Sequence, residues 1–224
     1  MSQTTCIRGV DWLVGWDGHQ HVYLRNSDLV FKGSDIIFVG DRYVDRVDIE
    51  LSGKNTMIIP GLVDIHAHPT TEPIRKGITD ETLSPGFWHS SLYEHLPVFD
   101  PVDDQGRLAC LKVALAELLL SGVTTLVDLS SPFEGWTETL LDSGIRGFVA
   151  PSFRDARWFT SNGHSLEYDW DYIAGQKAFS TAQKVVERAE SHSSGRLSAV
   201  VSPSQVDTCS EALLRDSHAF AQDH

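Results

Sequence analysis

The sequence predicts an α/β fold preceded by a small β-rich unit, and two observations carry this prediction. From about residue 61 onward, strand-like and helix-like segments alternate four times, in units well over twenty residues long. That order predicts parallel strands joined by right-handed helical crossovers. Residues 5–57 instead hold short apolar segments separated by turn residues, as β-strands do. We therefore expect two domains, residues 1–58 and residues 59–224.

Composition narrows the class of protein and of partner. The 224 residues are 41% hydrophobic and 22% charged, which is typical of a globular chain with a real core. The formal net charge of −13 argues against nucleic acid or an anionic membrane as a partner. Three widely spaced cysteines form neither a disulfide framework nor a zinc finger, which favours a reducing compartment. No apolar run reaches signal-peptide or membrane-span length, so we expect a cytoplasmic protein.

The first fifty residues predict short strands around turns. One strand is expected over 7–14, followed by a hairpin turn at Asp17 and Gly18. Further strands are expected over 22–24, 29–31, 36–39 and 47–51. Because so few short strands bury little apolar surface by themselves, this unit is expected to pack against other strands.

The stretch 60–69 is the candidate functional centre. Its apolar residues predict a buried strand that Pro69 ends. Side chains alternate along a strand, so Asp64, His66 and His68 are expected on one face and Val63, Ile65 and Ala67 on the other. The two histidines lie roughly 7 Å apart along the strand, and imidazoles at that spacing can converge on one metal ion.

The His-x-His spacing by itself is a weak signal. Two polar residues at a strand end would give the same pattern. His19 and His21 repeat it after a hairpin turn with no apolar run before them, and we interpret that pair as the solvated start of a strand.

The rest of the chain supplies the alternating elements. A long connection over 69–100 is interrupted by prolines, with a short helix expected over 87–96. A helix over 103–121 is capped by Asp103 and stopped by Gly122. The remaining elements are strands over 123–129, 146–150 and 197–201 and helices over 134–141, 174–191 and 210–221. Asp128, at a strand end, could face the site or cap the next turn.

Four residues are candidates for substrate contact. Arg154 and His164 belong to a second long loop over 152–171, which is rich in aromatic and charged side chains. Ser204 and Gln205 lie at the carboxyl end of the last strand. Each of these side chains is also compatible with ordinary surface packing.

The run Ile-Ile-Pro-Gly-Leu-Val-Asp-Ile-His-Ala-His over 58–68 resembles the first barrel strand of the amidohydrolase superfamily. Residues 116–128 and 209–214 are similar to the cytosine deaminase and chlorohydrolase branch. The resemblance implies a TIM-type (β/α)8 barrel with its first four βα units present here. It also implies that residues 1–58 are part of a β-sandwich completed by strands from the far C-terminus.

The resemblance implies a metal-dependent amidohydrolase that acts on a small-molecule substrate and hydrolyses a C–N bond of a cyclic amidine or amide through a metal-bound hydroxide. His66 and His68 would bind one divalent ion, zinc or alternatively iron. Asp64 would support them from outside the coordination sphere. The family's remaining ligands and proton-transfer residues lie on later strands, so the catalytic residues are expected beyond residue 224.

Two departures narrow the subtype. Binuclear members carry a carboxylated lysine at the end of the fourth strand, where this chain has Ser202, Pro203 and Ser204, which favours a mononuclear site. The methylthioadenosine and adenosylhomocysteine deaminases have a glutamate where this chain has Phe99, and a histidine where it has Ser204. Both differences argue against an adenosine-type substrate.

The alternative is a truncated, non-catalytic amidohydrolase-like scaffold or interaction protein. In either case four strands would leave sheet edges open, so the chain is expected to pair with itself as a homo-oligomer or with the remainder of the barrel. Taken alone, it is expected to be insoluble or self-associated and to bind metal weakly.

Overall fold

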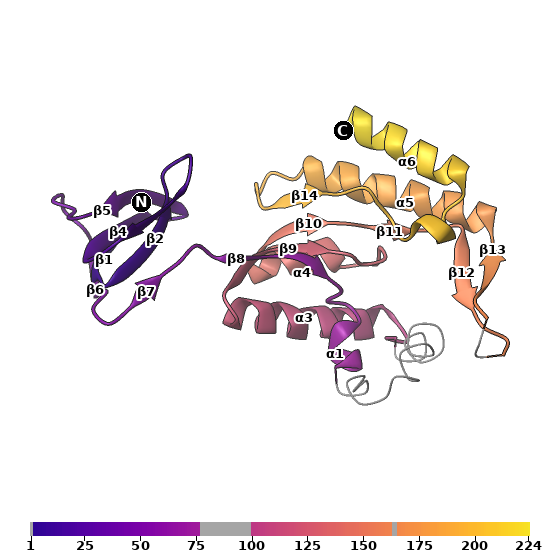
Figure 1. Ribbon diagram of the computed structural model, residues 1–224, viewed down its shortest axis with the longest axis horizontal. Coiled ribbons are helices and arrows are strands. Elements are labelled where there is room, and N and C mark those ends of the chain that lie inside the picture. The colour runs from indigo at the N-terminus through magenta and orange to yellow at the C-terminus, as the bar shows by residue number, and fades with distance from the viewer. Residues whose placement is uncertain (1, 77–99, 163–164) are drawn as a thin grey trace. The chain divides into compact units, whose positions relative to one another are not determined.

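The computed structural model describes residues 2–76, 100–162 and 165–224 and divides into two compact units, Met1–Gly61 and Leu62–His224 (Figure 1). Within those ranges no helix is long and apolar enough to cross a bilayer. The helix expected over 87–96, together with Phe99 and His164, lies outside the described residues.

The N-terminal unit contains two β-sheets. A four-stranded sheet has the order β5-β4-β1-β6 and a three-stranded sheet the order β3-β2-β7. The strands are β1 (Thr4–Val10), β2 (Trp12–Trp16), β3 (His21–Leu24), β4 (Ser27–Lys32), β5 (Asp35–Gly40), β6 (Ile49–Ser52) and β7 (Met57–Ile58). The buried apolar residues of this unit are Cys6, Val10, Leu13 and Val30.

The single strand expected over 7–14 is wrong, because the chain changes sheets there. The β1–β4 ladder shifts register between Ile7 and Val10, and Gly9 between them has a φ of +61°. That left-handed conformation suits glycine and bends the chain before β2 begins at Trp12. The two-residue strand β7 was not expected. His21 opens β3 and is exposed beside Trp16, which agrees with a solvated strand start.

The larger unit is built on a four-stranded sheet of order β14-β10-β9-β8. Its strands are β8 (Leu62–Ala67), β9 (Val123–Asp128), β10 (Arg146–Val149) and β14 (Leu197–Ala199), and every neighbouring pair is parallel. This confirms the predicted parallel arrangement of the four strands. Because β8 and β14 are the outer strands of this sheet, the site-bearing strand β8 lies at an edge.

The described helices of the larger unit pack against this sheet or against one another (Figure 1). They are α1 (Glu72–Arg75), α3 (Asp104–Leu120), α4 (Trp136–Ser143), α5 (Tyr172–Glu190) and α6 (Glu211–Asp223), with a 3₁₀ turn at Val206–Thr208. One core cluster joins Leu115 of α3 and Leu140 of α4 to Leu126 and Leu197 on the strands. As predicted, Asp103 caps α3, its carboxylate accepting the Gly106 amide, and Gly122 follows the helix at a φ of +85°.

The expected loop over 152–171 is wrong, because it contains three strands. β12 (Ala156–Phe159) and β13 (Glu167–Trp170) form an antiparallel hairpin, and β11 (Ser152–Phe153) pairs in parallel with β15 (Ser202–Pro203). The hairpin places Trp158 opposite Tyr168, and cross-strand aromatic pairs of this kind stabilise a two-stranded sheet.

Two expectations for β8 also fail. The strand is not buried: Val63 is 61% and Ile65 is 76% exposed. The reason is that β8 is an edge strand, with a neighbour on only one side in the described sheet. Strict alternation does not hold either. The register against β9 shifts between Asp64 and Ala67, so the face of Asp64 does not follow from the face of the histidines.

Candidate metal centre

The two histidines at the end of β8 converge. The Nε2 atoms of His66 and His68 lie 3.1 Å apart, with ring centroids separated by 5.0 Å. Two nitrogen ligands of a tetrahedral zinc, each about 2.0–2.1 Å from the ion, would lie about 3.3–3.4 Å apart. The pair is therefore close to the geometry that two imidazoles adopt around one ion, and a small separation of the rings reaches it.

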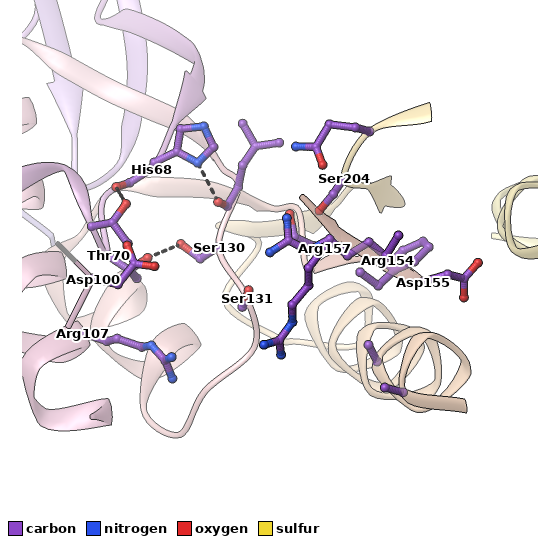
Figure 2. Close-up of a pocket in the computed structure, with 18 of the residues that line it drawn as sticks. His68, Thr70, Asp100, Arg107, Ser130, Ser131, Arg154, Asp155, Arg157 and Ser204 are labelled. Atoms are coloured by element: carbon purple, nitrogen blue, oxygen red, sulfur yellow. Dashed lines mark hydrogen bonds between the residues drawn. The ribbon is translucent and has the colours of Figure 1, made fainter. Parts of the chain in front are cut away.

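A main-chain carbonyl orients the second histidine. The Nδ1 atom of His68 lies 3.0 Å from the carbonyl oxygen of Leu129, so Nδ1 carries the proton and donates it (Figure 2). That tautomer leaves the lone pair of Nε2 directed toward His66. Partial desolvation of the ring, with the neighbouring His66 as a further cause, lowers the pKa of His68 despite the opposing hydrogen bond to Leu129, and so favours the neutral ring. A neutral imidazole is the form that binds metal.

Asp64 contacts the main chain of this site. Its Oδ1 atom accepts a hydrogen bond of 3.0 Å from the backbone amide of His66. The carboxylate therefore stabilises the conformation of the strand end, and its influence on His66 passes through the backbone.

A buried network lies behind the site. Asp128 is fully buried, and its carboxylate accepts hydrogen bonds from Trp136 Nε1, at 2.7 Å, and from the hydroxyl of Ser130. The hydroxyls of Ser130 and Thr70 lie 3.1 Å apart. Burial raises the pKa of Asp128 to about 6, although both hydrogen bonds oppose this change. Asp128 was expected either to face the site or to cap the next turn. Its side chain accepts a hydrogen bond from Trp136 of α4, which favours a structural role over direct contact with the site.

A cavity of about 660 Å³ adjoins His68, and three of the four substrate candidates line it. Arg154, Ser204 and Gln205 lie along its wall together with His68. Figure 2 shows His68 and Thr70 on one side and Arg154 and Ser204 on the other. Partial desolvation, and then the neighbouring Arg157, lowers the pKa of Arg154. Other charged groups of the wall are Arg75, Asp100, Arg107, Asp155, Arg157, Asp169 and Asp171.

The described part of the larger unit supplies two candidate metal ligands rather than a complete set. No group of three or more histidine, cysteine or acidic side chains suited to a metal occurs among the described residues. His66 and His68 fit a metal in distance, tautomer and charge, whereas a firm zinc site needs three or four protein ligands.

Sequence reasoning missed the groups that orient this pair. The Leu129 carbonyl, Ser130 and Thr70 carry no motif, and their proximity to His68 depends on how β8 pairs with β9. The polar residues that follow each strand end were the available signal, because the carboxyl ends of parallel strands meet at one edge.

Two curated relatives match most of the chain. It is 26% identical over 208 residues to 5'-deoxyadenosine deaminase of Methanosphaera stadtmanae, a match that covers 88% of this chain and 44% of that protein. It is 28% identical over 207 residues to 5-methylthioadenosine/S-adenosylhomocysteine deaminase of Bacillus thuringiensis, covering 88% and 43%. The chain thus spans less than half the length of these relatives. No protein-family model matches it.

Solved structures share the fold. The chain superposes on an adenosine deaminase of Xanthomonas campestris with bound zinc at a TM-score of 0.77 and 18% identity, covering 98% of this chain and 47% of that one. It superposes on zinc-complexed atrazine chlorohydrolase of Arthrobacter aurescens at 0.70 and 19% identity, covering 98% and 51%. These matches extend over both units of the chain. Together with the sequence relatives, they show that the chain is similar to deaminases and hydrolases of the amidohydrolase type and corresponds to the N-terminal part of these relatives.

Proposed function

We propose that this chain is the N-terminal part of a metal-dependent amidohydrolase that hydrolyses a C–N bond of a cyclic amidine or amide. The observation that carries the proposal is the convergence of His66 and His68 beside a polar cavity. The two imidazoles would bind one divalent ion, zinc by analogy with the zinc complexes named above or alternatively iron. When bound, such an ion supplies Lewis acidity that brings the pKa of a water molecule toward neutrality.

The chain's own residues would orient the ligands and the substrate. The Leu129 carbonyl fixes the tautomer of His68, and Asp64 fixes the backbone of His66. Arg154, Ser204 and Gln205 would contact a small substrate in the cavity. The named relatives act on adenosine-type nucleosides, whereas Ser204 and Phe99 depart from that subgroup. We therefore propose a nitrogen heterocycle as the substrate class without assigning a nucleoside.

Metal binding tests the proposal directly. Purified chain is titrated with zinc, and bound metal is measured by mass spectrometry for the wild type, His66→Ala and His68→Ala. The wild-type chain is expected to bind zinc weakly through two imidazoles, and either substitution is expected to abolish this binding, since one imidazole alone holds zinc poorly.

The second His-x-His pair is a matched control within the same chain. His19→Ala and His21→Ala remove exposed imidazoles from the N-terminal unit and are expected to leave the bound zinc unchanged. Equal losses from both pairs would contradict the assignment of the metal to β8.

A further inference from the structure

Both main-chain groups of Leu129 are hydrogen-bonded. The Leu129 amide donates to the Ala67 carbonyl at 2.9 Å, and the Leu129 carbonyl accepts from His68 Nδ1 at 3.0 Å. The strand β9 ends at Asp128, one residue earlier. The direction of this carbonyl therefore depends on the peptide that joins Leu129 to Ser130, beyond the regular strand.

Side chains fix that peptide. The Ser130 hydroxyl donates to the Asp128 carboxylate and lies 3.1 Å from the Thr70 hydroxyl, which belongs to the segment after β8. The second carboxylate oxygen accepts from Trp136 Nε1 of α4 at 2.7 Å. All four side chains are at least 94% buried, since Asp128 is 0%, Trp136 1%, Ser130 2% and Thr70 6% exposed. Water therefore does not replace these bonds when one is lost.

We propose that Asp128 is a positioning residue for the metal ligand His68, acting through Ser130 and the Leu129 carbonyl. The carboxylate holds Ser130, Ser130 fixes the peptide that carries the carbonyl, and the carbonyl keeps the His68 proton on Nδ1. The inference rests on the metal-binding role proposed above, but it concerns the tautomer of one imidazole and can be measured without metal.

The test uses three variants of the chain. Ser130→Ala removes the hydroxyl that joins residue 130 to the Asp128 carboxylate, and Asp128→Leu removes both acceptor oxygens. Asp128→Asn keeps an oxygen that accepts from Trp136 and adds an amide group that donates to the Ser130 oxygen. Ser217→Ala is the matched control, because Ser217 is also buried in the larger unit and donates one hydrogen bond, to the Leu214 carbonyl of α6. Circular dichroism confirms folding, and Ser130→Ala remains decisive if Asp128→Leu does not fold.

The first readout is the tautomer of metal-free His68, measured by nitrogen-15 NMR of the imidazoles at pH 8, with the signal assigned by a His68→Gln variant. The wild type, Asp128→Asn and Ser217→Ala are expected to carry the proton on Nδ1. Ser130→Ala and Asp128→Leu are expected to move it largely to Nε2. The second readout is zinc affinity, expected to fall about 10- to 100-fold in those two variants.

The outcomes separate the two proposals. An unchanged His68 tautomer and zinc affinity in Ser130→Ala and Asp128→Leu would overturn the positioning role, and would mean that the backbone bonds of Leu129 suffice. A shifted tautomer in a chain whose wild type binds no zinc would support the positioning role and refute the metal site instead.

Discussion

At the scale of single residues, Asp128 combines complete burial with two hydrogen bonds that require an acceptor. Burial raises its pKa from an ordinary 3.8 to about 6. The folded chain therefore binds this proton more tightly than the unfolded chain does. The resulting contribution to the free energy of unfolding is fully present below about pH 4 and is lost as the pH rises through about 6.

We predict that Asp128→Asn removes this pH dependence. The difference in unfolding free energy, wild type minus variant, is expected to fall by about 2 kcal/mol between pH 4 and pH 7. Chemical denaturation followed by circular dichroism at several pH values measures it. Asp28, Glu138 and Asp207 have lowered pKa values and contribute in the opposite direction, but both proteins share them, so they cancel in the difference. A constant difference across this range would contradict the prediction.

The residue scale also shows what the sequence can and cannot predict of the site. The convergence of His66 and His68 was expected from their spacing of two residues, which is a local feature of the sequence, although β8 ends at Ala67 and the ladder is irregular there. The position of Asp64 did not follow, because the ladder shifts register between Asp64 and Ala67. The contact between His68 and Leu129 joins residues 61 positions apart, and no local pattern encodes it.

At the scale of elements, α3 was predictable because several local signals agree. Its leucines repeat at helical spacing, Asp103 caps the first turn, and Gly122 provides the left-handed residue after the last. The hairpin β12–β13 was missed because its strands are only four residues long, and a mixture of aromatic and charged residues also suits a surface loop. Only the pairing of Trp158 with Tyr168 distinguishes the two, and that pairing is tertiary information.

We predict that Asp103→Ala destabilises the larger unit by about 0.5–2 kcal/mol, the usual effect of losing a helix N-cap. The carboxylate accepts the Gly106 amide at 2.8 Å, and alanine leaves that amide without its acceptor. Thermal unfolding measures the change. Asp103→Asn is the control, since asparagine caps helices about as well as aspartate, and equal destabilisation by both substitutions would refute the capping role.

At the scale of the whole molecule, the order of strands and helices was enough to predict four neighbouring parallel strands, because crossover connections leave few alternative topologies. Burial was not predictable from that order. An apolar sequence such as Leu62–Ala67 fits a central strand, yet β8 has its partner on one side only within the described sheet.

The exposed edge of β8 leads to a prediction about association. Leu62, Val63 and Ile65 are 48%, 61% and 76% exposed on a strand whose outer backbone groups face no strand of the described sheet. Open apolar edges of this kind pair with other chains, and a charged residue on such an edge opposes the pairing. We expect the purified chain to self-associate in light-scattering measurements and Ile65→Lys to shift it strongly toward monomer.

A second exposed isoleucine distinguishes pairing at the strand edge from non-specific hydrophobic association. Ile173 of α5 is 86% exposed, so Ile173→Lys adds the same charge and removes a similar apolar side chain away from β8. If association proceeds through the strand edge, Ile173→Lys leaves the size distribution close to that of the wild type. If both substitutions shift the chain equally toward monomer, net charge or scattered apolar surface governs the association. A monodisperse wild-type monomer would contradict association through the edge of β8.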